Sequence, residues 1–262
     1  MESFQEQAAF SRQAGKVDGK TVASHLQASD LRKRYGQRDV VRGVSLDVLQ
    51  NEIVGLLGPN GAGKTTTFYM IIGIQKPTSG AVYFNGSDIA SWPLHERARH
   101  GLSYLPQESS VFRKLSVYDN LRIILEYTGL SKADQRRKAE QLLEEFRIEH
   151  LRNSLASYLS GGERRRLEIA RALIREPKFV LLDEPFAGID PLAVDDIQNL
   201  IVALKQRGIG VLISDHNVRE TLRICDRAYL LHEGKVIVQG TPQDLVSDSK
   251  ARRVYLGEAF SM

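Results

Sequence analysis

The chain has 262 residues and a formal net charge of +4, and 42% of its residues are hydrophobic. This composition supports a packed core and excludes a globally disordered protein. The longest apolar runs, such as Ile53–Leu57 and Tyr69–Ile72, are far shorter than the about 20 residues of a membrane-spanning helix. We therefore expect a chain that does not cross a bilayer.

The beginning of the chain is polar and lacks the continuous apolar stretch of a secretory signal peptide. We predict a mobile N-terminal tail over residues 1–24, followed by one domain over residues 25–260. The single cysteine, Cys225, can form no internal disulfide and offers no metal-ligand pair. These features predict a cytosolic protein.

The first half of the domain reads as alternating strands and helices. Apolar and polar residues alternate in Val44–Val48, which predicts a half-buried strand, whereas the wholly apolar Ile53–Leu57 predicts a strand covered on both faces. A glycine-rich segment follows, and then a helix over Thr65–Ile74. Further short strands are predicted at Val82–Phe84, before an Asn-Gly turn, and at Leu102–Leu105.

The middle of the chain, from about residue 107 to about residue 175, is predicted to be mostly helical. Ser116 is placed to cap a helix with one apolar face, and Ser131 with Asp134 resembles the capping box of another. This segment interrupts the β/α alternation. We therefore predict that it forms a helical subdomain inserted into the core.

The alternation resumes with buried strands at Phe179–Leu182 and Ile209–Ser214 and a helix between them. Cys225 continues a helical apolar spacing, which favours a core position over a redox role. A hairpin is predicted over residues 228–238, and helices over residues 242–260. The predicted fold is therefore α/β, with a mainly parallel sheet, an antiparallel β part and the inserted helical subdomain.

Residues Gly58–Thr65 match the complete phosphate-binding P-loop pattern, with a buried strand before it and a helix after it. The glycines allow a tight turn in which several N–H groups face one anion, and the helix adds its positive N-terminal end. Lys64 would supply a mobile cation for the β and γ phosphates. The hydroxyl of Thr65 would be a Mg²⁺ ligand.

A second motif places two acids directly after the strand Phe179–Leu182. In α/β proteins the carboxyl edge of the sheet is where ligands bind. Asp183 would hold Mg²⁺ through water, and Glu184 would orient or deprotonate the attacking water. The motif is weak alone but strong beside a P-loop.

The run Leu159–Glu163, with the sequence Leu-Ser-Gly-Gly-Glu, resembles the signature motif of ATP-binding cassette (ABC) ATPases. The same run also fits a helix N-cap at Ser160. The family usually has Gln at the last position, so Glu163 departs from the pattern. Where the signature begins a helix, its free N–H groups can themselves bind phosphate.

Other elements of the family resemblance occur in the expected order. Tyr35 is similar to the aromatic residue that stacks on adenine, and Gln107 to the glutamine that touches Mg²⁺ and the subunit interface. Residues 188–190 resemble the loop that crosses the dimer interface, and His216 the switch histidine on γ-phosphate. Each has a simpler structural explanation when taken alone.

The motifs and the resemblance together imply a complete site. Catalytic roles fall to Glu184, His216 and Gln107, and metal contacts to Thr65, Gln107 and Asp183. The residues implied in nucleotide binding are Tyr35, Gly58, Pro59, Asn60, Gly61, Ala62, Gly63, Lys64, Thr65, Thr66, Ser160, Gly161, Gly162 and Glu163. The implied cofactors are ATP and Mg²⁺.

Five segments resemble a narrower group, the ATP-binding subunits of lipopolysaccharide export systems of Gram-negative bacteria: Thr66–Met70, Leu105–Glu108, Leu115–Leu121, Asp215–Thr221 and Arg253–Glu258. The resemblance implies an ATPase that powers extraction of lipopolysaccharide through separate transmembrane permease subunits. It also implies a homodimer with sandwiched ATP, peripheral on the cytoplasmic face of the inner membrane. Phe112 and Arg113 are candidates for the membrane-subunit contact, although ordinary packing of the helical subdomain explains them equally well.

Other functions remain open at this level. An ATPase subunit of another ABC transporter, such as a branched-chain amino acid importer, would share most of these motifs. A soluble ABC ATPase acting on nucleic acid or ribosomes is a further alternative, but we expect no nucleic-acid partner. We interpret the arginines at 164–166 as a solvated helix face. A small-molecule kinase would not need the signature motif.

Overall fold

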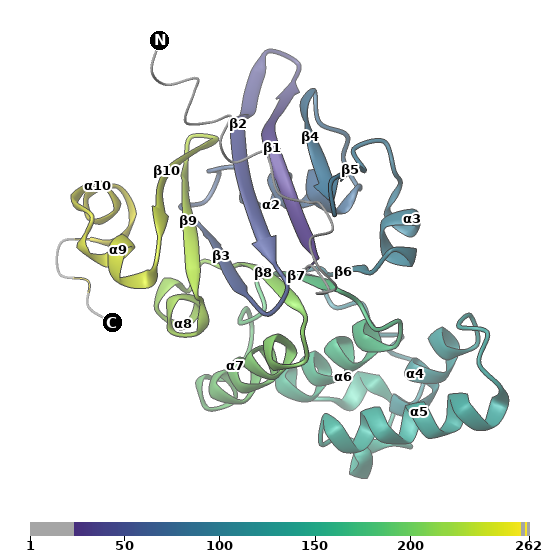
Figure 1. The fold of residues 1–262 in the computed structure, drawn as a ribbon. Coiled ribbons are helices and arrows are strands. Elements are labelled where there is room, and N and C mark those ends of the chain that lie inside the picture. Colours follow the sequence, from purple (N-terminus) through teal and green to yellow (C-terminus); the bar gives the residue numbers. More distant parts are fainter. Residues whose placement is uncertain (1–23, 258–259, 261–262) are drawn as a thin grey trace, which may run out of the picture.

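The computed structural model describes residues 24–257 and residue 260, so the predicted tail lies outside the described residues except for Ser24. Two β-sheets and a cluster of helices form the molecule (Figure 1). Within the described part of the chain, no helix is long and apolar enough to span a membrane. The domain boundaries given above stay a prediction.

The larger sheet has six strands in the order β10, β9, β3, β8, β7 and β6. All neighbours pair in parallel except β9 and β10, which form the predicted hairpin. Their bounds are β3 Ile53–Leu57, β6 Leu102–Leu105, β7 Phe179–Asp183, β8 Gly210–Ser214, β9 Arg227–His232 and β10 Lys235–Gly240. Every residue of β3, β7 and β8 is buried, as their apolar sequences predict.

The smaller sheet is antiparallel, in the order β2, β1, β4 and β5. Its strands are β1 His25–Tyr35, β2 Arg38–Leu49, β4 Ser79–Phe84 and β5 Ser87–Asp88. Sequence patterns miss β1, because register shifts on both sides of Leu31 break the alternation that marks a strand. Asn85 and Gly86 form the predicted turn between β4 and β5, with φ angles of 52° and 80°.

The helices occupy the positions that the apolar spacing predicts, except for α3, which the sequence analysis did not identify. Their bounds are α2 Lys64–Ile72, α3 Leu94–Arg99, α4 Val117–Leu125, α5 Lys132–Glu145, α6 Gly161–Leu173, α7 Pro191–Gln206, α8 Val218–Ile224, α9 Pro242–Ser247 and α10 Ser249–Ala251. A π-helical turn, Arg252–Leu256, follows α10. Cys225 is buried in the core at the end of α8, as expected.

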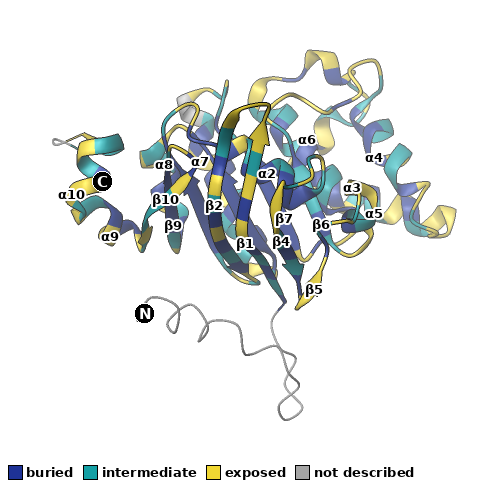
Figure 2. Cartoon of the chain, turned by 90° about the horizontal axis from the view of Figure 1, so that it is seen from above, coloured by how far each residue is buried: buried dark blue, intermediate teal, exposed yellow. Residues whose placement is uncertain are grey.

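The helical subdomain contains α4, α5 and α6 and lies at one end of the molecule (Figure 1). Both predicted caps are present, since Ser116 accepts a hydrogen bond from the Asp119 N–H at 3.0 Å and Ser131 one from the Asp134 N–H at 3.2 Å. The helices bury apolar faces toward one another and toward α7. Figure 2 shows the buried residues gathered along the strands and the inner sides of these helices.

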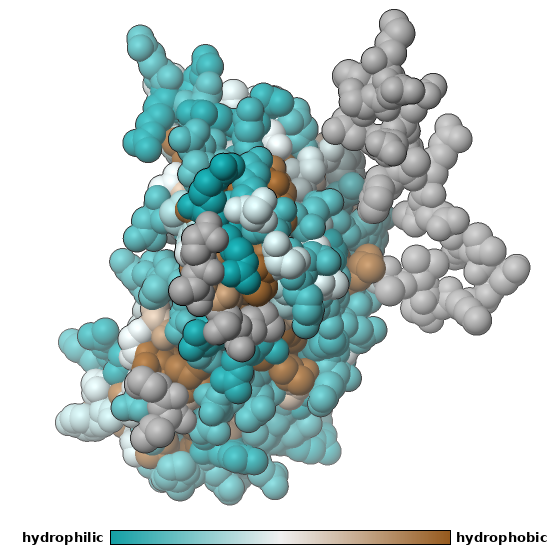
Figure 3. All heavy atoms as spheres, turned by 90° about the vertical axis from the view of Figure 1, so that its left-hand side faces the viewer, coloured by the Kyte–Doolittle hydropathy of each residue, from teal (hydrophilic) through white to brown (hydrophobic). Residues whose placement is uncertain are grey.

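The C-terminal segment covers the edge of the larger sheet beside β9 and β10. Leu245 and Ala251 pack into a small apolar cluster with Leu57, Leu222 and Leu230. The outer side of this region is mainly hydrophilic, broken by small apolar areas (Figure 3). The segment is therefore a packed part of the domain, as predicted for residues 242–260 as far as the structure describes them.

A polar cluster joins the two sheets far from the glycine-rich loop. Asp47 accepts hydrogen bonds from the Tyr229 hydroxyl at 2.8 Å and from Arg227 at 3.0 Å, and Arg227 also contacts Glu52. Burial opposes ionisation of Asp47, but these contacts and His25 outweigh it and lower its pKa from 3.8 to about 2. A group with a lowered pKa stabilises the fold in its charged form.

Replacing Asp47 with asparagine should therefore destabilise the domain. Hydrogen bonds to charged groups contribute about 2 kcal/mol, which corresponds to a melting temperature lower by about 4–8 °C. The contribution is complete above pH 3.8 and is lost as the pH falls toward 2, so the two proteins should converge there. Denaturation of Asp47→Asn measured from pH 7 downward tests this. Asp39 forms an exposed ion pair with Arg34, so Asp39→Asn is the control and should change the stability little. Equal stability of Asp47→Asn and the original chain at pH 7 would contradict it.

Candidate functional site

The loop between β3 and α2 can be built only from glycine at two positions. Gly58 has a φ of 149°, and a Cβ there would lie 2.2 Å from the carbonyl oxygen of Leu231. Gly63 has a φ of 103°, and its Cβ would lie 3.0 Å from the carbonyl oxygen of Val40. Strand β9 thus leaves no room for a side chain at Gly58, and at Gly63 the tight contact with β2 adds to a positive φ that favours glycine.

Lys64 lies inside this loop with only 6% of its surface exposed. Its ammonium donates hydrogen bonds to the carbonyl oxygens of Gly58 at 2.7 Å and Pro59 at 3.2 Å. Burial lowers the pKa of Lys64, while the charges of Glu184 and Asp183 act in the opposite direction. The structure therefore brings the predicted phosphate cation together with both predicted acids. Thr65, at the start of α2, is exposed, and Thr66 is half-buried.

Asp183 ends strand β7 and is buried. Its Oδ2 atom accepts a hydrogen bond from the Tyr104 hydroxyl at 3.3 Å. Its Oδ1 atom is buried and has no hydrogen bond of good geometry among the described residues, although the Ser214 hydroxyl interacts with this carboxyl and lowers its pKa. Burial, and after it the charge of Glu184, raises the pKa of Asp183 to about 6.

An unpartnered carboxylate oxygen fits the role of a Mg²⁺ contact. Mg²⁺ is usually held by one or two carboxylates together with substrate phosphates and retained waters. The described residues contain no group of three or more His, Cys, Asp or Glu that could form a cage for a metal ion. Asp183 offers a carboxylate oxygen and Thr65 an exposed hydroxyl, which are ligand types that suit Mg²⁺ bound together with phosphate.

The Glu184 carboxylate is contacted by two of the predicted site residues, Gln107 and His216. The Gln107 amide donates to Glu184 Oε2 at 2.7 Å, and Nδ1 of His216 lies 3.3 Å from the same oxygen. Glu184 has a φ of 47°, a rare conformation for a residue with a side chain. Such strained positions concentrate at functional sites.

Asp215 holds the backbone on both sides of this group of residues. It is fully buried and accepts hydrogen bonds from the backbone N–H groups of Asn217 at 2.7 Å and Phe186 at 3.1 Å. Nδ1 of His216 lies 3.6 Å from its carboxylate. Asp215 thus connects the chain after β8 to the chain after Glu184. Asp215 begins one of the segments that carry the family resemblance, but the sequence assigned it no role.

The signature residues form the N-terminus of α6. Ser160 accepts a hydrogen bond from the Glu163 N–H at 3.3 Å, and the Glu163 carboxylate accepts one from the Ser160 N–H at 2.8 Å. Burial would raise the pKa of Glu163, but the hydrogen bonds from Ser160 outweigh it and lower the pKa. Glu163 therefore completes a capping box, which gives the departure from the usual Gln a structural role.

Gly161 lies against the loop of residues 188–190, where a Cβ would be 3.0 Å from the Gly188 carbonyl oxygen. A cavity of about 250 Å³ is lined by residues 160–163 together with Asp190 and neighbouring side chains. Within one chain, the described residues thus form two groups. One contains the P-loop and the two acids, and the other contains the signature and the 188–190 loop.

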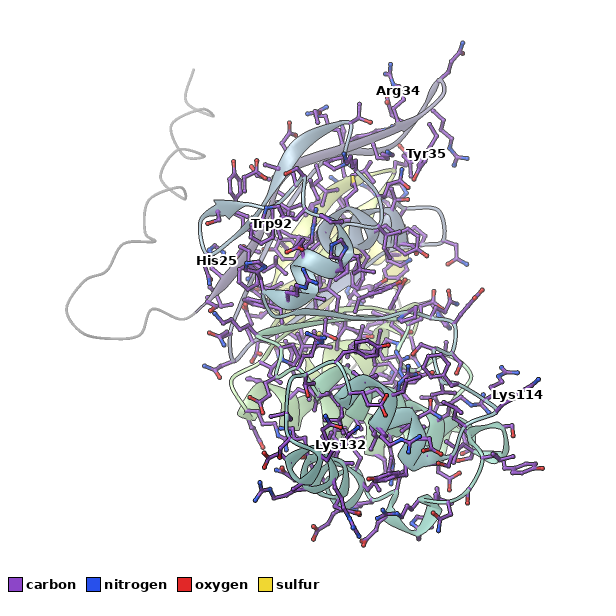
Figure 4. All side chains as sticks on the ribbon, turned by 90° about the vertical axis from the view of Figure 1, so that its right-hand side faces the viewer. His25, Arg34, Tyr35, Trp92, Lys114 and Lys132 are labelled. Atoms are coloured by element: carbon purple, nitrogen blue, oxygen red, sulfur yellow. The ribbon has the colours of Figure 1, made fainter. Side chains whose placement is uncertain are left out.

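Tyr35 lies at the end of β1 and has 46% of its surface exposed. Figure 4 shows Arg34 and Tyr35 projecting from the β1–β2 hairpin at one end of the molecule, with Lys114 projecting lower down on the same side of the view. The Lys33 ammonium lies 5.3 Å from the Tyr35 ring centroid. Tyr35 is thus exposed with a cation over its ring, and its adenine role stays a prediction.

The interpretation of residues 164–166 as a solvated face is wrong. Arg165 is buried, pairs with Glu168 at 3.0 Å and donates to the Pro106 carbonyl oxygen at 3.3 Å. Arg164 donates to the carbonyl oxygen of Leu159, and Arg166 pairs with Asp196. The aliphatic part of an arginine side chain can pack against the protein while its guanidinium group remains charged, so a charged residue type does not by itself indicate an exposed position.

Comparison with known proteins decides the family. The family model described as ABC transporter matches residues 41–187. This chain belongs to the ABC transporter family. The predicted family and α/β fold are thus confirmed, and the family identifies the chain as an ATPase that couples ATP hydrolysis to transport. The P-loop and both acids lie within the matched residues.

Two similar relatives have the same description. The lipopolysaccharide export system ATP-binding protein LptB of Haemophilus influenzae is 56% identical over 240 residues, which cover 91% of this chain and 100% of the relative. LptB of Escherichia coli is 57% identical over 238 residues, covering 90% of this chain and 99% of the relative.

Two solved structures are also similar. The ADP conformation of MJ1267, an ATP-binding cassette of an ABC transporter, has a TM-score of 0.81 and 30% identity, covering 91% of this chain and 100% of that one. A dimeric post-hydrolysis state of the cassette MJ0796, bound to ADP and Pi, has a TM-score of 0.73 and 26% identity, covering 83% of this chain and 98% of that one.

Proposed function

We propose that this chain is the ATP-hydrolysing subunit of a lipopolysaccharide exporter, acting as a homodimer on the cytoplasmic face of the inner membrane. The similarity to LptB over nine-tenths of the chain supports the transported substrate. The main structural support for ATP hydrolysis is that Gln107 and His216 both contact one oxygen of Glu184. The charges of Glu184 and Asp183 also act on Lys64.

Each residue of the site has its own role in ATP hydrolysis. Lys64 exchanges its carbonyl partners for the β and γ phosphates of ATP, since the charged phosphate is the stronger acceptor. Asp183 and Thr65 would hold Mg²⁺, which neutralises charge on the phosphates when it is bound. Glu184 accepts a proton from the attacking water, and His216 contacts the γ-phosphate. Gln107 holds the Glu184 carboxylate in place until the reaction begins.

The proposed assembly is a dimer in which each P-loop meets the signature residues of the other copy. The P-loop of one copy would face Ser160 and its neighbours at the N-terminus of α6 in a second copy. Two-fold symmetry then creates two equivalent sites. A dimeric cassette structure is among the similar solved structures, which supports this assembly.

Glu184→Gln tests the catalytic assignment. Glutamine keeps the shape of the side chain but cannot accept a proton, and general-base assistance is typically about 10²–10⁴-fold. Hydrolysis should fall by that order, whereas ATP binding through Lys64 should persist. The variant should therefore become dimeric in Mg-ATP but not in ADP, as measured by size-exclusion chromatography with light scattering.

His216→Ala is the matched comparison for Glu184→Gln, because it removes a γ-phosphate contact and should give slow hydrolysis with a weaker dimer. Undiminished hydrolysis by Glu184→Gln would remove Glu184 from the catalytic role. A variant that binds ATP and stays monomeric would count against closure of the dimer by ATP.

Mixing two inactive variants tests whether the sites are shared. Ser160→Arg should block the site on the partner copy, and Lys64→Ala should disable the site on its own copy. A mixed dimer has one site with both changes and one with neither, so part of the ATPase activity should return. Ser157→Arg, an equally bulky change at an exposed serine nearby, should hydrolyse ATP normally. Normal hydrolysis by Ser160→Arg alone would disprove the shared site.

The contact to the membrane subunits is proposed at the groove beside Gln107. A cavity of about 290 Å³ there is lined by Gln107, Ser109 and Arg113 together with residues of α6 and of the chain after Glu184. Phe112 is 46% exposed, and Arg171 lies over its ring at 5.0 Å. A partner helix in this groove would reach the residue that holds Glu184.

Phe112→Ala should therefore reduce the recovery of transmembrane subunits with this chain from detergent-solubilised membranes. Nucleotide binding by the isolated protein should not change, because Phe112 lies outside the P-loop. Tyr127→Ala, which removes an aromatic residue that is 76% exposed elsewhere on the helical subdomain, is the control. The proposed docking groove is wrong if Phe112→Ala and Tyr127→Ala recover the same amount. Recovery of ribosomes or DNA in place of lipid-export subunits would overturn the proposed function.

A further inference from the structure

Tyr104 lies between the P-loop helix and the strand that carries Asp183. It is on β6, which pairs in parallel with β7, and its hydroxyl donates to Asp183 Oδ2 at 3.3 Å. Its ring meets the ring of Tyr69, on α2, edge to face, with centroids 6.3 Å apart and planes at 89°. One side chain thus contacts the elements that supply two of the three predicted metal contacts, Thr65 on α2 and Asp183 on β7.

The two oxygens of the Asp183 carboxylate consequently differ. Oδ2 is engaged by Tyr104, whereas Oδ1 is buried without a hydrogen-bond partner in the described part of the chain. Ser214 is opposite Asp183 in the β7–β8 register, and its buried hydroxyl interacts with the Asp183 carboxyl and lowers its pKa, although no hydrogen bond of good geometry joins them in the described part of the chain. A buried polar atom without a partner is costly, so Oδ1 is the oxygen left for a ligand.

We infer that Tyr104 is a positioning residue for the metal contact of Asp183, which rests on the proposed Mg²⁺ role of that carboxylate. The hydroxyl fixes one oxygen and thereby aims the other toward the space beside Lys64 and Thr65. The edge-to-face contact with Tyr69 keeps the hydroxyl in register with the P-loop helix. Partners that orient a metal ligand typically change metal affinity by about 10–100-fold when they are removed.

The test is Tyr104→Phe in the full chain, which keeps the ring and removes the donor. Mn²⁺ replaces Mg²⁺ as a paramagnetic probe, and its binding to the complex with ADP is titrated by electron paramagnetic resonance. We expect Mn²⁺ affinity to fall about tenfold, while ADP affinity in EDTA stays within about twofold. In steady-state assays the Mg²⁺ concentration for half-maximal velocity should rise, and kcat at saturating Mg²⁺ should change little.

Tyr83→Phe, on β4 in the other sheet, is the matched control and should bind Mn²⁺ as the original chain does. Asp183→Asn separates this inference from the proposed function. Full Mn²⁺ affinity in Asp183→Asn would contradict the proposed metal contact itself. Loss in Asp183→Asn with full affinity in Tyr104→Phe would overturn only the role of Tyr104.

A double variant tests whether Tyr104 acts through Asp183. If Tyr104 acts through Asp183, adding Tyr104→Phe to Asp183→Asn should change Mn²⁺ affinity no further. Additive losses in the double variant would show that Tyr104 affects the site by another route, and they would overturn the inference. A fall in ADP affinity in EDTA equal to the fall in Mn²⁺ affinity would do the same, because it would indicate general damage to the P-loop.

Discussion

Burial of charge at the carboxyl edge of the parallel sheet is the constraint on which the rest of the site depends. Lys64, Asp183 and Asp215 are all buried, and a buried ion is costly unless it is paired and hydrogen-bonded. Lys64 and Asp215 are each compensated by two backbone partners. Asp183 has the hydroxyl groups of Tyr104 and Ser214 as neighbours, and its Oδ1 atom has no hydrogen bond of good geometry among the described residues. The negative charge of the Asp183 carboxylate is thus incompletely compensated, and a cation bound with phosphate would compensate it.

The topology explains why these charges meet. Strands β3, β8 and β7 are neighbours in the sheet and run in the same direction, so the residues that follow them reach the same edge. β3 leads into the loop that contains Lys64, β7 ends at Asp183, and β8 is followed by Asp215 and His216. Residues more than a hundred positions apart in the chain are therefore assembled by strand order alone. The glycines of the loop permit this, because β9 leaves no room for a side chain at Gly58 and the positive φ at Gly63 favours glycine.

Features with a local cause could be predicted from the sequence, and features with a tertiary cause could not. The P-loop, the acids after β7, the caps at Ser116 and Ser160 and the buried strands all follow from short patterns of residue type. The roles of Tyr104, Asp215 and Arg165 depend on partners in other elements, so no spacing in the sequence reveals them. Strand β1 was missed because its bulges break the alternation, and the arginines of α6 were misinterpreted because charge in a sequence does not disclose burial. Glu163 shows the intermediate case, since its departure from the family pattern was visible but its capping role required the structure.

Helix α6 connects the two surfaces that the proposed function requires. Its N-terminus carries Ser160, which would face the partner copy, and its side holds the chain segment that contains Gln107. Arg165 donates to the Pro106 carbonyl oxygen, Glu168 accepts from the Ser110 N–H at 3.0 Å, and Arg171 donates to the Ser110 carbonyl oxygen at 2.5 Å. Gln107 in turn contacts Glu184. Because these contacts tie the segment on both sides of Gln107 to one helix, α6 both carries the signature residues and holds the segment whose glutamine contacts Glu184. Glu184 itself follows core strand β7, and its backbone N–H donates to the Ser214 carbonyl oxygen at 2.6 Å, so the contact between Gln107 and Glu184 joins the segment held by α6 to the core sheet.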